Sequence, residues 1–331
     1  KRMHKFNLIR STYVDAPDHA EAIHMTLTGW KLVGANVTTK DVNRVHPAMG
    51  AVVAKECGDR ARKLPAYVTV PQSGQLGVRV HYGTAGMLGT AYEPMDAGMP
   101  SADPKEAFSG PGDLKLNAGM GARRLIDRLA LLRGVNRLDA AAEKLDVYNQ
   151  RALEMLSGGT AADAFDLSRE PLKVRERYGR HSWGQQALLS RRLAEAGVPF
   201  TLVNFNLNQT GGQDWDNHTD IFKTMKTKLL PPTDRAISTL LDDLEERGLL
   251  DSTLVAVYGE FGRTPKINKD AGRDHWGPVN TMLFAGGGVK PGNVIGASDH
   301  IGGEVISHLQ TPENLAATIY EKLGIPRQAI W

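Results

Sequence analysis

Three polar clusters in this sequence carry residue types that bind metal ions or anions. The first, Gly211–His218, contains two carboxylates, Asp214 and Asp216, and the imidazole of His218. Oxygen and nitrogen donors of this kind suit a hard or borderline divalent cation. Asp and His are also common in turns, and Asp216 can cap a helix that follows. The local sequence alone therefore favours a solvated polar turn over a metal site.

The second cluster, Gly259–Pro265, places Glu260 and Arg263 directly after an apolar segment. A carboxylate followed by a guanidinium suits a site that holds both a cation and an anion. Arg263 can bind two oxygens of a phosphate or sulfate at once. The alternative is a structural Glu–Arg pair in a loop, and the local sequence favours neither reading.

The third cluster, Gly272–Pro278, offers His275 as a candidate metal ligand. Its neighbour Asp274 is either a second ligand or a residue that orients the imidazole. The alternative is a core histidine hydrogen-bonded near Trp276, which is the commoner role of a single histidine. The sequence leaves these roles open.

A hydroxyl cluster near the start of the chain offers a candidate nucleophile. Ser11 and Thr12 follow an apolar run and precede a predicted helix, whose positive N-terminal end favours anions. Beside a metal, such a hydroxyl can ionise and attack phosphorus or sulfur. The alternative is a turn or a helix cap. His19 follows as a metal ligand, a leaving-group acid or a surface residue.

The motifs that the chain lacks exclude several enzyme classes. There is no G-x-S-x-G, no H-E-x-x-H, and no G-x-G-x-x-G with an acidic residue at the right distance. This disfavours α/β serine hydrolases, zincin proteases and Rossmann dehydrogenases. Cys57 is the single cysteine, so an intramolecular disulfide and a cysteine-rich metal site are both excluded. Any metal must be held by His, Asp and Glu.

Strands and helices alternate along most of the chain, and the polar clusters lie beside the strands. The predicted strands are 6–9, 66–70, 200–205, 253–258 and 281–285, and the predicted helices are 18–27, 48–57, 122–156, 182–196, 232–247 and 312–323. This order indicates an α/β fold with a mainly parallel sheet. Functional residues gather at the carboxyl ends of such strands. A Gly- and Pro-rich stretch, 71–118, is predicted to be a loop-rich insertion.

Size and charge fit a soluble globular protein. The chain has 331 residues, of which 41% are hydrophobic and 23% charged. The net charge of +3 is small, and the Lys and Arg residues are scattered along the sequence, so we expect no nucleic-acid partner. No apolar run is long enough for a transmembrane helix, and no signal peptide is present. The sequence begins without Met and enters a strand at once, so we expect a processed or truncated product.

A wider set of motifs resembles one known family. The matching segments are Leu8–Ser11, Asp18–His19, Leu27–Gly29, His46–Gly50, Gly86–Gly89, Tyr92–Pro94, Trp215–His218, Gly259–Pro265, Gly272–Trp276, Gly296–Asp299 and Thr311–Tyr320. With these motifs the chain resembles a large bacterial family of sulfatase-like proteins in the alkaline phosphatase superfamily. The resemblance covers nearly the whole chain, and the stretch 259–276 is highly specific.

The resemblance implies a single domain over residues 1–331, built as a three-layer α/β/α sandwich with a metal site at one sheet edge. By order along the chain, Asp216, His218 and His275 match the ligands of one superfamily metal. Glu260 stands where a later Asp ligand of a second metal would be, and Ser11 where the nucleophile would be. Zinc is the favoured metal, with manganese or calcium as alternatives.

Two departures from the superfamily pattern bear on activity. Phe261 occupies the place of a late His ligand, which leaves the second metal poorly held. The family's opening strand, with its Asp-rich loop, precedes the segment at which this sequence begins. We therefore expect an incomplete second metal site and a sheet that lacks a central strand.

These observations lead to two main hypotheses. The first is a metal-dependent hydrolase of phosphate or sulfate monoesters, acting on a small molecule or a glycan, with Ser11 as nucleophile and Arg10 or Arg263 holding the anion. Because Ser11 lies outside a Cys/Ser-x-Pro-x-Arg motif, phosphate is slightly favoured. The second is a non-catalytic module that binds anionic glycans. A mutase or transferase of the same superfamily is a third. The resemblance implies a periplasmic or extracellular location.

Overall fold

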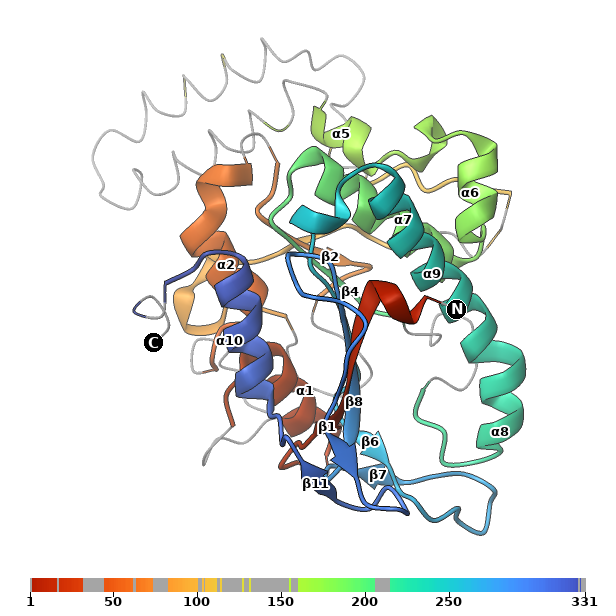
Figure 1. The fold of residues 1–331 in the computed structure, drawn as a ribbon. Coiled ribbons are helices and arrows are strands. Elements are labelled where there is room, and N and C mark those ends of the chain that lie inside the picture. The colour runs from red at the N-terminus through yellow and green to blue at the C-terminus, as the bar shows by residue number, and fades with distance from the viewer. Residues whose placement is uncertain are drawn as a thin grey trace.

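The computed structural model describes residues 2–16, 18–31, 45–61, 64–73, 83–100, 160–205 and 215–326, together with residues 103, 105–111, 114, 127, 131, 155 and 328. Within these ranges the chain has a mixed α/β fold with helices and several sheets, some of them parallel (Figure 1). No helix in this part of the chain is long and apolar enough to cross a membrane. The expected α/β class is therefore confirmed.

A four-stranded sheet carries the first predicted strand near its middle. Its order is β5 (Val255–Val257), β8 (Asn280–Ala285), β1 (Phe6–Thr12) and β9 (Val294–Ile295). Strand β8 runs antiparallel to both β1 and β5, whereas β9 runs parallel to β1. The expectation of a mainly parallel sheet does not hold here, because the chain from β5 to β8 has no helix and can therefore return antiparallel.

A separate three-stranded sheet is entirely parallel. Its order is β3 (Met95–Asp96), β2 (Tyr67–Val70) and β4 (Phe200–Val203). Strand β3 lies within the stretch 71–118, which was predicted to be a loop-rich insertion. The described part of that stretch is mostly loops and short 3-10 turns, but it also supplies this edge strand.

Strands β4 and β5 end their respective sheets and are not hydrogen-bonded to each other. Both nevertheless pack against the same apolar layers. Val203 and Val255 contact one buried cluster, and Phe200 and Ala256 contact a second. Every residue of both strands is only partly buried, whereas β2 is buried along its whole length. Each of the two strands therefore has one edge whose backbone groups are not hydrogen-bonded to another strand of the described chain.

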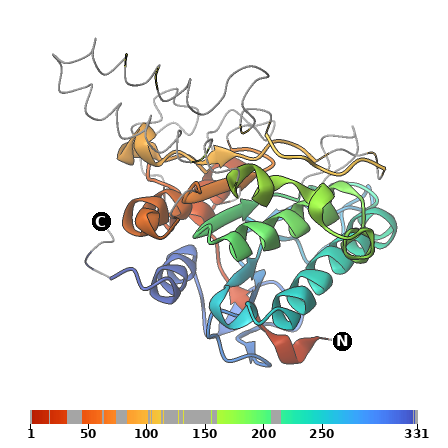
Figure 2. The ribbon, with the colours of Figure 1, turned by 90° about the horizontal axis from the view of Figure 1, so that it is seen from above.

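Helices cover the strands from two sides. Helices α2 (Met49–Cys57) and α10 (Pro312–Lys322) pack against Met282 and Phe284 of β8. A second cluster buries residues of β2 against three further helices, α5 (Thr160–Phe165), α7 (Ser182–Ala196) and α9 (Leu230–Glu246). Figures 1 and 2 show α10 and α9 on opposite sides of the strands, with α7 packed beside α9.

The remaining elements are short. Helix α1 (His19–Thr28) follows β1 and packs against α10. Helix α6 (Leu172–Tyr178) precedes α7, and α8 (Ile221–Thr224) continues through a π-helical turn into α9. Two small antiparallel sheets complete the described part of the chain. Their strands are β6 (Gly262–Arg263) with β7 (His275–Trp276) and β10 (Ala297–Ser298) with β11 (Val305–Ser307).

Local sequence explains where the main helices begin and end. The Asp18 side chain accepts a hydrogen bond from the Ala20 amide, which caps α1, and Gly29 ends that helix at φ 76°. Helix α7 ends at Gly197, and Thr311 caps α10. These bounds agree with the sequence prediction to within one or two residues. The predicted helix 122–156 lies almost wholly outside the described residues.

A buried ion-pair network joins α7 to α9. The Arg191 side chain is fully buried and lies 2.8 Å from Glu170 Oε2 and 2.9 Å from Asp243 Oδ2. Tyr178 donates a hydrogen bond to the same Asp243 oxygen. Since an unpaired charge is costly to bury, these groups depend on one another. The network fixes the helical layer beside the three-stranded sheet.

Candidate functional site

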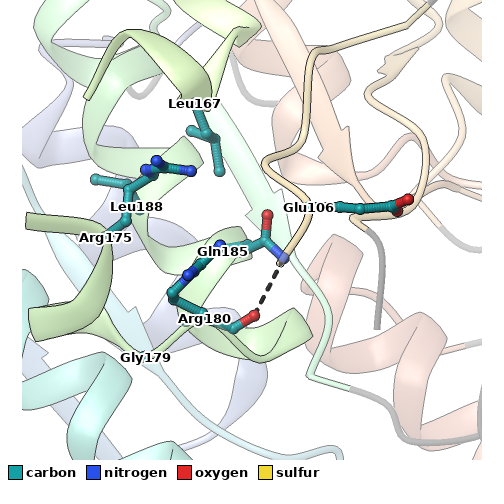
Figure 3. Close-up of a pocket in the computed structure, with 8 residues that line it drawn as sticks. Glu106, Leu167, Arg175, Gly179, Arg180, Gln185 and Leu188 are labelled. Carbon is teal, nitrogen blue, oxygen red and sulfur yellow. Dashed lines mark hydrogen bonds between the residues drawn. The ribbon is translucent and has the colours of Figure 1, made fainter. Parts of the chain in front are cut away.

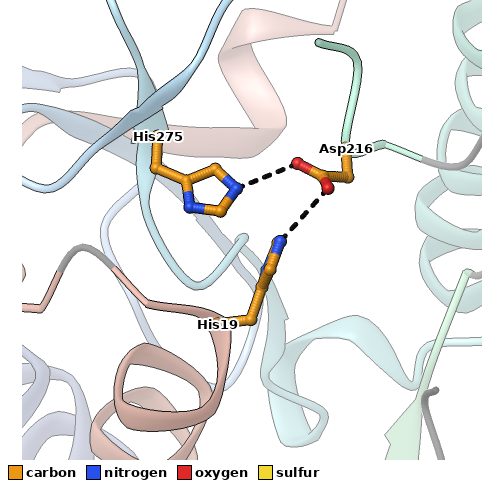
Figure 4. A group of neighbouring side chains, drawn as sticks. All are labelled: His19, Asp216 and His275. Carbon is orange, nitrogen blue, oxygen red and sulfur yellow. Dashed lines mark hydrogen bonds and ion pairs between the residues drawn. The ribbon is translucent and has the colours of Figure 1, made fainter. Parts of the chain in front are cut away.

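Three side chains from distant parts of the chain meet at one point (Figure 4). His19 is the first residue of α1, Asp216 precedes α8, and His275 begins β7. Their candidate ligand atoms all lie within 4.8 Å of one another. His19 Nε2 is 3.3 Å from Asp216 Oδ2, and His275 Nε2 is 3.1 Å from Asp216 Oδ1. Asp216 is thus the centre of the cluster.

His218 adds a fourth donor to this group. Its Nε2 atom lies 2.9 Å from Asp216 Oδ1 and 3.2 Å from His275 Nε2. Three imidazoles therefore direct the same ring nitrogen toward one carboxylate. The sequence prediction that Asp216, His218 and His275 lie together agrees with this geometry.

Two further carboxylates hold the outer nitrogens of the rings. Glu260 Oε1 is 2.9 Å from His19 Nδ1, and Asp274 Oδ1 is 2.7 Å from His218 Nδ1. Both acids were predicted as metal ligands. Here they occupy the orienting position instead, which was the second role left open for Asp274. Such outer carboxylates fix the ring and its tautomer.

The donor set fits a divalent metal on chemical grounds. With Glu260 and Asp274 accepting from the Nδ1–H groups, the Nε2 atoms of His19 and His218 become acceptors that face a carboxylate. A proton or a metal cation must then lie between them. Three imidazoles and one carboxylate are ligands that zinc accepts, and tetrahedral ligands at about 2.0–2.1 Å lie about 3.3 Å apart. The separations of 2.9–3.3 Å between Asp216 and the three imidazoles, and between His218 and His275, are close to that value. The three residues whose ligand atoms all lie within 4.8 Å of one another are His19, Asp216 and His275.

Arg263 gives the site a fixed positive charge. Its Nη2 atom lies 2.6 Å from Asp216 Oδ1. Burial opposes ionisation of Asp216, but the hydrogen bond and the charge of Arg263 outweigh it and lower the pKa of Asp216 to about 2. The hydrogen bond to Glu260 raises the pKa of His19. Arg263 was predicted to bind a substrate anion, and here its partner is a carboxylate of the protein.

The β6–β7 hairpin sets two of these residues side by side. Arg263 pairs directly with His275 across the hairpin. A Cβ atom on Gly262 would lie 1.8 Å from the Val279 carbonyl oxygen, so only glycine permits this close approach. The glycine in the Gly-Arg-Thr-Pro sequence therefore has a packing role that places Arg263.

A second set of backbone contacts holds Asp216 and His218. The Arg273 amide donates to the Asn217 carbonyl at 3.0 Å, and the Asn268 side chain donates to the His218 carbonyl at 3.0 Å. A Cβ atom on Gly272 would lie 1.9 Å from that same His218 oxygen. Asn268 was not predicted as a site residue. Its Nδ2 atom also lies 3.2 Å from Asp274 Oδ1. The only sequence signal for Asn268 was that it is a polar residue in the loop between two predicted clusters.

Phe261 forms an apolar wall beside the two inner histidines. Its ring centre is 4.4 Å from that of His275 and 5.1 Å from that of His19. The ring is 7% exposed and belongs to a small buried cluster with Val14, Ala16, Ala22 and Met25. Phe261, which the sequence resemblance places where a late His ligand would be, thus packs against the site and supplies no ligand.

Ser11 and Arg10 lie in a different setting from the one predicted. Strand β1 continues through Thr12, so Ser11 lies within the strand, at the irregularity between Ile9 and Thr12, and does not follow the strand. Its side chain is fully buried and donates to the His308 carbonyl at 2.7 Å. Arg10 is exposed on the same strand. A buried hydroxyl bonded to the backbone cannot reach a substrate in this conformation.

Two pockets of the described chain lie apart from this cluster. One, with room for about one water-sized occupant, lies between α6, α7 and the 105–111 segment (Figure 3). There Gln185 donates to the Arg180 carbonyl and accepts from the Phe108 amide, so its polar ends are already used. The other lies beside α1 and contains His24 and His46.

Comparison with known proteins gives a family and a weak structural likeness. No curated protein matches the chain. The crystal structure of Ps i-CgsB in complex with k-i-k-neocarrahexaose is similar, with 14% identity, a TM-score of 0.45 and coverage of 98% of this chain and 65% of that one. The crystal structure of Ps i-CgsB matches with 13% identity, a TM-score of 0.42 and coverage of 97% and 65%. This chain thus spans less than two thirds of the length of those proteins. The family described as "Protein of unknown function (DUF1501)" matches residues 1–331, and the chain belongs to that family.

Proposed function

We propose that this protein is a metal-dependent hydrolase of phosphate or sulfate monoesters of small molecules or glycans. The convergence of His19, Asp216 and His275 supports this proposal. These residues are separated by about 200 and about 60 positions in the sequence, and each has an oriented ligand atom within 4.8 Å of the others.

In this proposal the cluster holds one divalent ion, with zinc favoured over manganese or calcium. His19, Asp216, His218 and His275 are the ligands, and Glu260 and Asp274 orient two of the imidazoles. When bound, the ion supplies Lewis-acid polarisation of the ester. A second metal is not included, because Glu260 is bonded to His19 and Phe261 offers no ligand atom.

Arg263 is the proposed anion-binding residue. Its guanidinium lies at the edge of the cluster, 2.6 Å from Asp216. A bound cation would neutralise Asp216 and release guanidinium donors toward a phosphate or sulfate oxygen. Ser11 has no role in this proposal because its side chain is buried. Arg10 has none because it is exposed on β1. The attacking group in this proposal is therefore a water molecule.

The proposed fold is the three-layer α/β/α arrangement of the alkaline phosphatase superfamily, formed as one domain over residues 1–331. Helices on both sides of the strands support it (Figure 1). The resemblance of the sequence motifs also motivates the periplasmic or extracellular location that we include in the proposal.

The first test is the metal content of the purified protein, measured by elemental mass spectrometry. The wild type is compared with Asp216→Ala and His275→Ala, and with His300→Ala as a control, because His300 is exposed and outside the cluster. We expect about one equivalent of metal bound at the cluster to be lost in the first two variants and kept in the control. Unchanged metal content in His275→Ala contradicts the assigned site.

The second test is turnover of an aryl phosphate and an aryl sulfate by the metal-loaded protein. We expect a metal-dependent rate that falls at least a hundredfold in Arg263→Ala, since that variant keeps the imidazole ligands. A metal-loaded protein that binds sulfated or phosphorylated glycans without hydrolysing either ester supports the alternative of a non-catalytic binding module. Phe261, an apolar ring where the superfamily has a ligand, is the observation that favours this alternative.

A further inference from the structure

A small pocket lies beside α1, on a different face of the helix from His19. It is lined by residues of three segments, namely His24, Leu27, Thr28, His46, Ala48, Gly83 and Thr84. His24 is five residues after His19, which turns it about 140° around the helix axis. The pocket has room for about one water-sized occupant, so it suits an ion or a water molecule and excludes a sugar or nucleotide.

His24, which lines this pocket, carries a buried polar atom without a partner in the described chain. The residue is 6% exposed, and its Nε2 atom has no hydrogen-bond partner among the described residues. A buried polar atom left without a partner costs about 1–3 kcal/mol. Nearly all such atoms in folded proteins are paired with protein, water or an ion. The partner of this nitrogen is therefore expected to be a bound species.

His46 lies across the pocket from His24. The two ring centres are 6.2 Å apart. With metal–nitrogen distances of about 2.0–2.1 Å, two imidazoles on one ion have ring centres about 5 Å apart at a tetrahedral angle and about 6.4 Å apart when opposite. The observed separation lies near the upper end of that range, which places the two imidazoles on nearly opposite sides of an ion. Trp30 stacks on His46 with ring centres 4.8 Å apart and nearly parallel planes, which restricts the imidazole.

The backbone around the pocket is fixed by hydrogen bonds. The Ala48 amide donates to the Thr84 carbonyl at 3.0 Å, and the Met87 amide donates to the Val45 carbonyl at 3.1 Å. Thr28 donates its hydroxyl to the His24 carbonyl at 2.8 Å, so it is already engaged. The segment that carries His46 is therefore tied to the 84–87 segment, and the stacking of His46 on Trp30 places it against the end of α1.

Both imidazoles are in the form that binds metals. Burial, with the charge of His46 as a smaller cause, lowers the pKa of His24 to about 4, and burial also lowers the pKa of His46. Neutral imidazole is the ligating form. The described residues that line the pocket include no carboxylate and no thiol. Such a site selects zinc, copper or nickel over calcium or magnesium, which require oxygen ligands.

We propose that His24 and His46 form a binding site for one transition-metal ion, separate from the cluster around Asp216. Solvent completes the coordination. The bound ion joins α1 to the segment that leads into α2, and so stabilises the helix that also carries His19. This inference does not depend on the proposed hydrolase function.

The test is a titration of metal-free protein with zinc chloride, followed by calorimetry and by elemental analysis after desalting. We expect two equivalents in the wild type, one equivalent in His46→Ala, and two in the control His300→Ala. His46→Ala is the main variant because His46 is only partly buried, and His24→Ala, which empties a buried position, is the second. Circular dichroism of each variant establishes that it is folded.

The outcomes separate this inference from the proposed function. One zinc equivalent lost in His46→Ala and another lost in His275→Ala supports both. A wild type that binds a single equivalent, lost in His275→Ala and kept in both His46→Ala and His24→Ala, overturns the second site and leaves the first. A single equivalent lost in His46→Ala and kept in His275→Ala supports the second site and contradicts the first.

Discussion

The substitution Glu260→Gln tests whether the outer carboxylates orient the metal-binding imidazoles. Glu260 lies 2.9 Å from His19 Nδ1, and its side chain is 28% exposed. Glutamine keeps the shape and an acceptor oxygen but removes the negative charge that holds the ring. Loss of an outer carboxylate typically lowers metal affinity 10- to 100-fold. That range corresponds to about 1.4–2.7 kcal/mol.

Asp274→Asn is the matched comparison, because Asp274 makes the same contact with His218 Nδ1 at 2.7 Å. Its side chain is 54% exposed, so water screens its charge more effectively. We therefore expect a loss near 100-fold for Glu260→Gln and near 10-fold for Asp274→Asn. The ranking, rather than either value alone, follows from the structure.

The assay is competition for zinc against a chromogenic chelator at fixed pH and ionic strength. Thermal unfolding of each metal-free variant establishes that the fold is kept. Equal affinity of wild type and Glu260→Gln, or a larger loss in Asp274→Asn, would refute the orienting role. Loss of all measurable binding in Glu260→Gln would instead assign Glu260 as a direct ligand.

Two further substitutions probe the surrounding structure. Arg191→Met leaves Glu170 and Asp243 buried with fewer partners. We expect it to lower the free energy of unfolding, measured in urea, by about 3 kcal/mol. This value is at the low end for a broken buried ion pair, because neighbouring arginines still contact both carboxylates. The loss of stability caused by Arg191→Met should be largest at pH 7 and should shrink below about pH 4. Arginine holds the pKa values of Glu170 and Asp243 below normal, and the stabilisation is lost when these carboxylates are protonated. A loss of stability that does not change with pH contradicts this account. Gly272→Ala forces a Cβ atom toward the His218 carbonyl, and we expect about 1–3 kcal/mol of destabilisation with weaker zinc binding. Unchanged zinc affinity in a folded Gly272→Ala protein shows that this loop does not set the position of His218.

The resemblance of the sequence motifs pointed to residues that the structure brings together, whereas the sheet differs from the expectation. Asp216, His218 and His275 were matched by their order along the chain to the ligands of one superfamily metal, and their donor atoms do lie together. The antiparallel course of β8 was missed. Alternation of strands and helices predicts parallel pairing, but the 21 residues from 259 to 279 contain only a hairpin, which imposes no parallel return.

The first strand was predicted to end at residue 9, before Ser11, and it extends to Thr12 for a physical reason that a single sequence does not show. A strand ends where its pairing partners end, and those of β1 come from the far end of the chain. The Gln310 amide donates to the Ser11 carbonyl, and Thr12 pairs with Asn280 and Gln310, which lie about 270 and 300 residues away. Gly296, in a left-handed conformation, then brings its backbone against the Ser11 side chain. Local hydroxyl patterns carry no information on either contact.

The outer edges of β4 and β5 have a consequence for how the purified chain behaves. Their backbone amides and carbonyls lack ladder partners in the described chain, yet the side chains on both faces are apolar or packed. Amide protons on these edges should exchange with deuterated solvent far faster than those shared by β1 and β8. The same groups can take up an extended segment of another molecule, because a free strand edge is a template for pairing. Self-association that rises with concentration, and that is reduced by a charged residue on either edge, is the behaviour this topology leads us to expect.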